Sequence, residues 1–159
     1  MSNTDQVFCI QAIGKVQRNQ DPITVQIDPV YQAALKGLEG FSHVIVYWWA
    51  DRFDNTNFRQ TLQVPLPYAN DVEAGVFACR SPIRPNTLMS TVCEIIHVDH
   101  DKGHLLIKNI DAFHDTPIID LKPYFPIVDR VQEVRVPYYS ADWPQWVPDD
   151  GIGLMEGEG

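Results

Sequence analysis

The stretch LMSTVCEIIHVDHDKGHLLIKNI, residues 88–110, contains two apolar runs separated by five residues that include two aspartates, a lysine and a glycine. The runs, 88–98 and 104–110, have the length and the β-branched content of strands. The segment between them, 99–103, ends in Gly103, and glycine readily adopts the positive φ that tight turns require. The stretch therefore predicts a β-hairpin.

Further strands are predicted around this hairpin. The run FSHVIVYWWA, residues 41–50, is continuously apolar and aromatic, which indicates a strand covered on both faces. Shorter strands are expected at 8–16, 23–27, 75–79 and 117–121. One short helix is predicted over 30–35, because Asp28-Pro29 has the form of a helix cap followed by proline. Many short strands with glycine and proline turns indicate an all-β domain, either a barrel or a sandwich.

Other segments are expected to be irregular. Residues 51–70 are polar and end in two prolines, which predicts a long, mobile loop. Residues 80–86 hold Pro82 and Pro85, so an extended segment or a turn is expected there. We expect one domain over 1–140 and an acidic, Trp- and Gly-containing tail over 141–159 that is partly flexible.

The charge balance bears on possible partners. The chain carries 21 acidic and 12 basic residues, a net charge of −9, and no Lys or Arg follows Arg135. Because nucleic acids are bound largely through phosphate neutralisation, this balance weakens an RNA-binding role without excluding it. No apolar run is long enough to cross a bilayer, and the first residues do not resemble a secretion signal. We therefore expect a cytoplasmic protein without a membrane partner.

Two segments concentrate candidate functional groups. In GVFACRSPIRPN, residues 75–86, two arginines lie in a segment that prolines stiffen, and guanidinium groups suit carboxylates and phosphates. In DAFHDTPIIDLKPY, residues 111–124, carboxylates could hold a ribose hydroxyl or a ligand cation. Residue types alone also allow plain surface arginines in the first segment and ordinary turn chemistry in the second.

Three other patterns have competing interpretations. The imidazoles and carboxylates of 97–104 suggest a metal site, but the predicted hairpin turn favours solvated side chains, and we expect no metal. The aromatic residues 47–49 could stack on a base or belong to the core or a dimer interface. Trp143 and Trp146 could cover an acceptor pocket or pack between subunits.

The two functional segments resemble signatures of the TsaA-like (TrmO) family. GVFACRSPIRPN is similar to the family's GVFATRSPxRPN, and DTPIIDLKPY is similar to its DGTPVxDIKPY. GLEGFSHVIVYWW, residues 37–49, resembles the family's GLExFSHxxVLYW, and Ile13-Gly14 matches an early IG. The resemblance covers about residues 7–126, with the motifs in the family's order.

The resemblance implies a single small β-barrel with one short helix and an irregular C-terminal tail, working as a homodimer that binds S-adenosyl-L-methionine. It implies a methyltransferase acting on the exocyclic amine of threonylcarbamoyl-modified adenosine beside the tRNA anticodon. The alternatives are a small-molecule methyltransferase and a non-catalytic S-adenosylmethionine-binding module. In agreement, the sequence has no GxGxxG unit of the Rossmann type, and its GxG at 151–153 lies in the tail.

The resemblance also implies roles for individual residues. The residues expected to bind the cofactor are Asp51, Arg52, Arg80, Arg84, Asn86, Ile95, Phe113, His114, Asp115, Thr116 and Lys122. Arg80, Arg84 and Asn86 would lie near the methionine carboxylate, and Ile95 would wall the adenine or ribose. The candidates for orienting or deprotonating an acceptor are Tyr124 and Asp111.

Several positions depart from the family pattern. Thr87-Leu88-Met89 replaces the family's Pro-Ile-Gly, and His114-Asp115-Thr116 replaces Asp-Gly-Thr. Asp51-Arg52 stands where relatives often carry a His-containing pair, and the extra C-terminal domain of many tRNA enzymes is not expected here. These departures concern the acceptor and catalysis more than binding of the cofactor, so the two alternative functions stay open.

Overall fold

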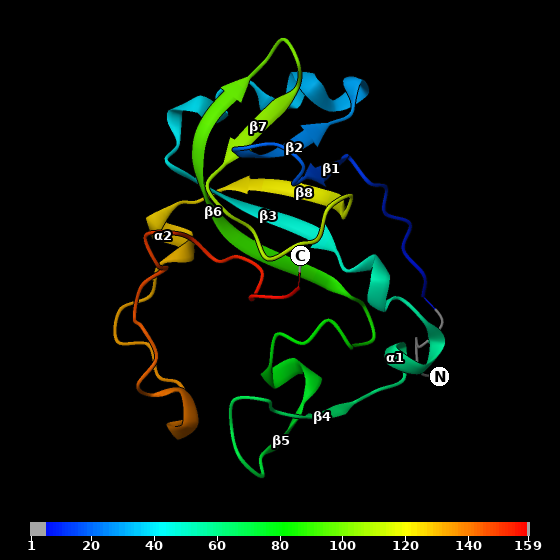
Figure 1. Ribbon diagram of the computed structural model, residues 1–159, viewed down its shortest axis with the longest axis vertical. Coiled ribbons are helices and arrows are strands. Elements are labelled where there is room, and N and C mark those ends of the chain that lie inside the picture. Colours follow the sequence, from blue (N-terminus) through cyan, green and yellow to red (C-terminus); the bar gives the residue numbers. More distant parts are fainter. Residues whose placement is uncertain (1–5, 159) are drawn as a thin grey trace.

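Six antiparallel strands form a closed barrel in the computed structural model, which describes residues 6–158 (Figure 1). In order around the barrel the strands are β1 (Gly14–Gln17), β2 (Ile23–Ile27), β7 (His104–Ile107), β6 (Leu88–Asp99), β3 (His43–Trp49) and β8 (Pro117–Pro123). The barrel closes because β8 pairs with both β3 and β1. Closure removes the unpaired edges that an open sheet would leave. The all-β barrel predicted from the resemblance is therefore confirmed.

The predicted hairpin is present as β6 and β7. The two strands pair antiparallel, with Asp99 opposite His104, and Gly103 in the turn has a φ of 68°. The Asp99 carboxylate accepts hydrogen bonds from the backbone N–H groups of Asp101 and Lys102, both at 3.1 Å. The acidic residues of this turn thus include one that stabilises the backbone bend itself.

The barrel interior takes alternate residues of each strand. On β3, Val44, Val46 and Trp48 are buried, whereas the side chains between them are only half-buried. The prediction that this strand is covered on both faces is therefore wrong, because a single-layer barrel has one packed side. The largest fully buried side chains are those of Leu105, Ile107, Ile110, Ile118, Val16, Val25, Val44, Val46, Thr87 and Cys93.

Two predicted strands end elsewhere than expected. The alternating pattern of 8–16 continues into a barrel strand only from Gly14, and Phe8 is 75% exposed. The reason is the register, because Gly14 is paired with Ile27 on one side and Ile118 on the other, where both ladders end. The strand expected at 75–79 is instead β5 (Glu73–Gly75), followed by the 3-10 turn η4 (Val76–Ala78).

The segment 51–70 is not the irregular loop that was predicted. It contains the 3-10 turn η3 (Asp51–Phe53), the helix α1 (Thr56–Arg59) and β4 (Gln63–Pro65), which pairs with β5 in a hairpin outside the barrel (Figure 1). The helix predicted over 30–35 is the 3-10 helix η1 (Pro29–Leu35). The other helical pieces, beyond the single helix predicted, are η2 (Leu38–Gly40), α2 (Pro126–Asp129) and η5 (Tyr138–Ser140).

The C-terminal part of the chain leaves the barrel and comes back to it. From 130 to 149 nearly every residue is exposed, whereas 151, 153 and 154 are partly buried. In Figure 1 the returning segment, drawn in red, ends beside the barrel. A division between a domain and a tail at residue 140 stays a prediction. Among residues 6–158, no helix is long and apolar enough to cross a membrane.

Gly14 lies close against the backbone of the neighbouring strand β2, and a substitution at this position tests the packing of the barrel. A Cβ atom at this position would lie 2.1 Å from the backbone oxygen of Gln26. Because backbone cannot rotate away as a side chain can, we expect Gly14→Ala to lower the free energy of unfolding by about 2 kcal/mol. Gly40→Ala is the matched control, since a Cβ there has nothing within 4 Å. Equal effects of the two substitutions on urea unfolding would contradict this account.

Candidate functional site

A cavity of about 260 Å³ lies at the end of the barrel where β3 finishes and β6 and β8 begin. Segments far apart in the sequence meet there: the turn after β3, the segment before β6, the loop between β7 and β8, and the C-terminal segment. The lining residues are Trp48, Ala50, Asp51, Arg52, Phe53, Arg80, Pro82, Met89, Asp111, Phe113, Thr116, Gly153, Leu154, Met155 and Glu158. The cavity therefore combines aromatic and apolar walls with two arginines and three carboxylates.

Asp111 is held at the cavity by a hydrogen-bonded path from the core. The indole Nε1 of Trp48 donates to the hydroxyl of buried Thr91 at 3.0 Å, and the Thr91 hydroxyl donates to Asp111 Oδ1. An indole N–H can only donate and a threonine hydroxyl carries a single proton, so the Thr91 proton must point to the carboxylate. The path thus fixes Asp111 as an acceptor at this end of the barrel.

The position of Asp111 raises the pKa of its carboxyl above the ordinary value for aspartate. Burial is the main cause, because desolvation disfavours the charged form. The hydrogen bond from Thr91 and the charges of Arg80 and Arg18 act in the opposite direction and only partly offset it. A carboxylate with a raised pKa in a cavity is a stronger proton acceptor than an exposed one, which suits it to acid–base chemistry.

Arg18, at the end of β1, holds the loop that carries Asp111. Its guanidinium Nη1 donates to the carbonyls of Ile110 at 2.7 Å and Ala112 at 3.0 Å, the residues on either side of Asp111. Its backbone N–H donates to Nδ1 of His114 at 3.0 Å. Burial lowers the pKa of Arg18 from its ordinary value, and the nearby Asp111 charge partly restores it. Sequence reasoning missed this residue, because a single arginine after a strand carries no signal of such a role.

The segment before β6 contributes Arg80 and Pro82 to the cavity wall. Arg80 also donates to the hydroxyl of Ser90 at 3.2 Å, and the Pro82 carbonyl accepts from Thr87 at 2.7 Å. Asn86, which was predicted with Arg80 to line the cofactor site, is exposed and is not among the lining residues. The structure therefore brings only part of this motif to the cavity.

Arg84 has a different environment from Arg80. Its guanidinium turns back into its own segment and donates to the carbonyls of Val76 at 2.8 Å, Ser81 at 3.0 Å and Cys79 at 3.2 Å. Three backbone carbonyls saturate much of its donor capacity, so it stabilises the fold of this segment and does not line the cavity. The prediction of two arginines converging on one ligand is not supported by this arrangement.

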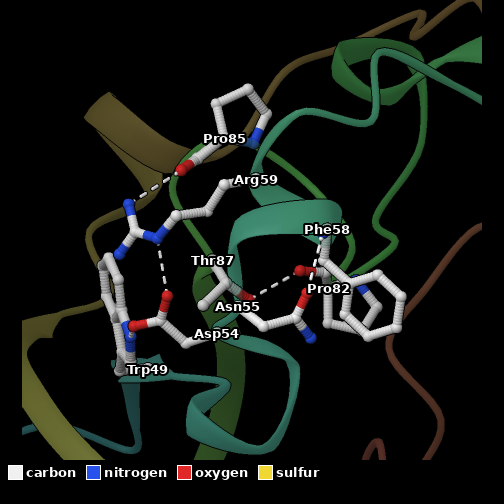
Figure 2. A network of polar contacts seen from close by, with 8 residues as sticks. All are labelled: Trp49, Asp54, Asn55, Phe58, Arg59, Pro82, Pro85 and Thr87. Atoms are coloured by element: carbon white, nitrogen blue, oxygen red, sulfur yellow. Dashed lines mark hydrogen bonds and ion pairs between the residues drawn. The ribbon is translucent and has the colours of Figure 1, made fainter.

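A second network of polar contacts holds residues 80–86 through the backbone of Pro85 (Figure 2). Arg59 of α1 donates to Asp54 Oδ1 at 2.6 Å and to the carbonyl of Pro85 at 3.0 Å. The indole of Trp49 donates to the other oxygen of Asp54 at 2.9 Å. These two bonds, that from Arg59 first, lower the pKa of Asp54 from its ordinary value. The network connects β3 and α1 to residues 80–86. It thereby stabilises the cavity wall to which Arg80 belongs.

The predicted turn at 113–116 is divided between the cavity and the surface. Phe113 and Thr116 line the cavity, and the guanidinium of Arg52 lies 4.2 Å over the ring of Phe113. Arg52 and Asp51 reach the cavity from η3, and their role in binding the cofactor stays a prediction. Of the eleven residues expected to bind the cofactor, the cavity thus collects Asp51, Arg52, Arg80, Phe113 and Thr116.

His114 and Asp115 face away from the cavity lining. Asp115 forms an ion pair with Lys15 at 3.4 Å, and His114 accepts from the backbone of Arg18. Asp115 has a φ of 64°, so this position keeps a left-handed conformation where the family signature has glycine. Aspartate is among the few residues other than glycine that adopt this conformation readily. The substitution therefore preserves the turn.

Lys122 and Tyr124 lie at the opposite end of the barrel. Lys122 pairs with Asp120 at 3.0 Å, and the ring of Tyr124 lies 6.5 Å from that of His43 at the start of β3. Eight residues of mostly extended chain separate Tyr124 from Thr116, about 25 Å at the usual rise of a strand. Within a single chain Tyr124 and Asp111 therefore lie at opposite ends of the barrel, and the role of either as the group that orients or deprotonates an acceptor stays a prediction.

Ile95 is also remote from the cavity. It is paired with Ile107 of β7 and packs against the core, six residues along β6 from the lining residue Met89. The register shifts between Ile95 and His97, and the pairing then continues to Asp99. The predicted role of Ile95 in walling the adenine is not supported by this placement.

The described residues also line two larger cavities. One of about 400 Å³ beside η1 has a largely apolar lining with only Lys36 and Asp120 charged. The other, of about 810 Å³, lies between the β4–β5 hairpin and the C-terminal region and shares Arg80 and Pro82 with the Asp111 cavity. Trp143 lines it, with its ring 4.9 Å from that of Tyr68. Among residues 6–158, no three His, Cys, Asp or Glu side chains are grouped to hold a metal ion.

The buried carboxylate of Asp111 has a consequence for stability. Because its pKa is raised in the folded state, the folded protein loses stability as pH rises through that pKa, whereas below the ordinary aspartate pKa the penalty vanishes. We expect Asp111→Asn to unfold at a temperature higher by about 2–4 °C at pH 7, with the gain shrinking towards pH 4. Asp101→Asn, in the β6–β7 turn, controls for the loss of one charge. A gain independent of pH would contradict the assignment.

Comparisons with known proteins agree with the barrel and its motifs. The family model for the tRNA-methyltransferase O N-terminal domain matches residues 11–130. A probable S-adenosyl-L-methionine-binding protein of Archaeoglobus fulgidus is 34% identical over 127 residues, 80% of this chain and 33% of that protein. The human tRNA (adenine(37)-N6)-methyltransferase is 36% identical over 104 residues, 65% of this chain and 23% of the enzyme.

A solved structure, TrmO from P. aeruginosa, has the same fold. It superposes with a TM-score of 0.65 and 24% identity, covering 86% of this chain and 63% of that one. The chain thus spans less than two thirds of the length of each of these three proteins. The family model, in contrast, matches most of the chain. This match confirms the predicted resemblance and shows that the chain belongs to the tRNA-methyltransferase O N-terminal domain family.

Proposed function

We propose that the chain binds S-adenosyl-L-methionine in the Asp111 cavity and transfers its methyl group. The observation that carries this proposal is the convergence of Arg80, Arg52 and Asp111 on one cavity with aromatic walls. The comparisons support it, because the archaeal relative is named for S-adenosyl-L-methionine binding and the human relative for methyl transfer.

The lining residues fit the chemical groups of this cofactor. A guanidinium such as that of Arg80 suits a carboxylate, and the Asp111 carboxylate suits a cation. Trp48, Phe53 and Phe113 provide apolar and aromatic surface for a nucleobase. The cavity of about 260 Å³ is small for a ligand of this size, since such sites usually measure about 300–1,000 Å³. Movement of one wall would enlarge it for the whole cofactor.

The residues of the cavity would act mainly by positioning. When bound, the cofactor supplies a methyl group on a sulfonium, which is open to attack by an amine. Arg80 would orient the donor, and the fixed carboxylate of Asp111 would orient the acceptor amine and take up its proton. Placement of two reactants can supply much of the rate enhancement. The raised pKa of Asp111 favours proton uptake.

For the acceptor, we propose the exocyclic amine of threonylcarbamoyl-modified adenosine beside the tRNA anticodon. The family description and the name of the human relative support a tRNA adenine. A small-molecule acceptor is the second candidate, favoured by the net charge of −9 and by the neighbouring cavity of about 810 Å³ with its aromatic lining. A homodimer and a cytoplasmic location stay predictions, and analytical ultracentrifugation tests the first.

Incubation with methyl-labelled S-adenosyl-L-methionine tests the acceptor. With tRNA from cells lacking this modification enzyme and with a metabolite extract, we expect label in tRNA, decreasing as salt weakens phosphate contacts. Asp111→Asn should reduce the rate by at least tenfold while leaving tRNA binding unchanged. Label in the metabolite fraction alone would favour the second candidate. Binding of the donor without any transfer would leave a non-catalytic binding module.

Arg80 and Lys122 provide a matched test of where the donor binds. We expect Arg80→Ala to weaken S-adenosyl-L-methionine binding at least tenfold, about 1.4 kcal/mol, in titration calorimetry. Lys122→Ala removes a similar positive charge at the other end of the barrel and should leave the affinity within twofold. An equal loss of affinity in both variants would contradict the placement of the donor in the Asp111 cavity.

A further inference from the structure

The C-terminal segment 150–158 forms one wall of the Asp111 cavity. Gly153, Leu154, Met155 and Glu158 line the cavity opposite the barrel residues. We call this segment the strap. In Figure 1 it is the red segment that returns to the barrel after the long excursion of the chain. The wall that it forms consists mainly of the apolar side chains of Leu154 and Met155.

Asn109 anchors the strap. Its side-chain Nδ2 donates to the carbonyl of Asp150 at 3.2 Å, and its Oδ1 accepts from the backbone of Ile110 at 3.0 Å. Gly151 and Gly153 lie against the same side chain. A Cβ on Gly151 would come within 2.9 Å of Asn109 Cβ, and one on Gly153 within 2.5 Å of its Nδ2. The GxG at 151–153 thus allows close docking of the strap.

Asn109 lies in the same loop as Asp111, between β7 and β8. Asn109 precedes Asp111 by two residues, and Arg18 binds the carbonyl of Ile110 between them. The docked strap and the Asp111 carboxylate are therefore positioned by the same short piece of backbone. A strap that leaves Asn109 would open the cavity beside Asp111 without disturbing the ladder of the barrel.

The hydrogen bond from Asn109 joins the strap to the barrel. The tether of the strap, residues 130–149, is exposed apart from partial burial at 139 and 140, and it contacts the β4–β5 hairpin through the ring of Trp143, 4.9 Å from that of Tyr68. Within the strap, the Glu158 carboxylate accepts from the backbone N–H of Met155 at 2.8 Å, and this bond does not involve the barrel. The contacts that must break on opening are thus few and centred on Asn109.

Displacement of the strap would enlarge the cavity. With the strap docked, about 260 Å³ is available, below the usual range for ligands of this class. We propose that the strap is a lid of the methyl-donor site, with Asn109 as its anchor, which opens to admit the donor and then packs Leu154 and Met155 against it. This inference rests on the proposed function. Its signature is a slow release of the donor that depends on strap docking.

Gly153→Val tests the docking itself. Gly153 does not have a positive φ, so valine introduces the contact with Asn109 without backbone strain. In the ligand-free protein we expect hydrogen exchange over 150–158 to accelerate at least fivefold. In the Asn109→Ala background, where the obstructing side chain is gone, the same substitution should change the exchange less than twofold. Ile152→Ala, on an exposed residue outside the cavity lining, is the control.

The release of S-adenosyl-L-methionine tests the function of the lid. In stopped-flow measurements we expect Gly153→Val to accelerate dissociation at least fivefold, and Ile152→Ala to leave it within twofold. Faster strap exchange with unchanged dissociation, or a higher affinity in the Gly153→Val variant, would overturn the lid. Absence of binding by every form, the unaltered chain included, would instead refute the proposed function, while the exchange data would still report on docking.

Discussion

The hydrogen-bonded path from Trp48 through Thr91 to Asp111 connects the barrel core to the cavity. Its three members come from β3, from β6 and from the loop between β7 and β8, so it joins the parts of the chain that surround the cavity. Because the Trp48 indole can only donate to Thr91, the Thr91 hydroxyl donates its proton to the Asp111 carboxylate. The placement of the remaining cavity residues follows from this fixed point.

Arginines serve two purposes around this site. Arg18 and Arg84 donate to backbone carbonyls and thereby hold the two loops that form the cavity, the loop around Asp111 and the segment before β6. Arg59 connects the second of these to the end of β3. Arg52 and Arg80 remain at the cavity lining. The division matters because a rigid wall loses little conformational freedom when a ligand binds, so the bracing arginines support the binding arginines indirectly.

Burial of the Asp111 carboxylate sets stability against function. A raised pKa means that the folded protein bears a penalty for ionising this group at neutral pH. Functional sites commonly contain groups that lower the free energy of unfolding, because these groups are required for binding or catalysis. The strap adds a second feature of this kind, since the cavity beneath it, of about 260 Å³, is small for a nucleoside-sized ligand while the strap is docked.

The sequence by itself determined the local pieces of this protein and its family. Alternation with a glycine turn identified the β6–β7 hairpin, because turn chemistry and side-chain period act between near neighbours. The barrel class was implied by the resemblance of the motifs around Arg80 and Thr116 to those of a known family. Only the tertiary structure decided which residues share the cavity. Arg80 and Arg84 are alike in sequence, yet one lines the cavity and the other braces its own loop. Tyr124 lies in a matching motif but at the other end of β8, and Arg18, which belongs to no motif, holds the loop that carries Asp111. The reason is that strand register and barrel closure are long-range pairings, and no local pattern encodes where a strand ends relative to its neighbours.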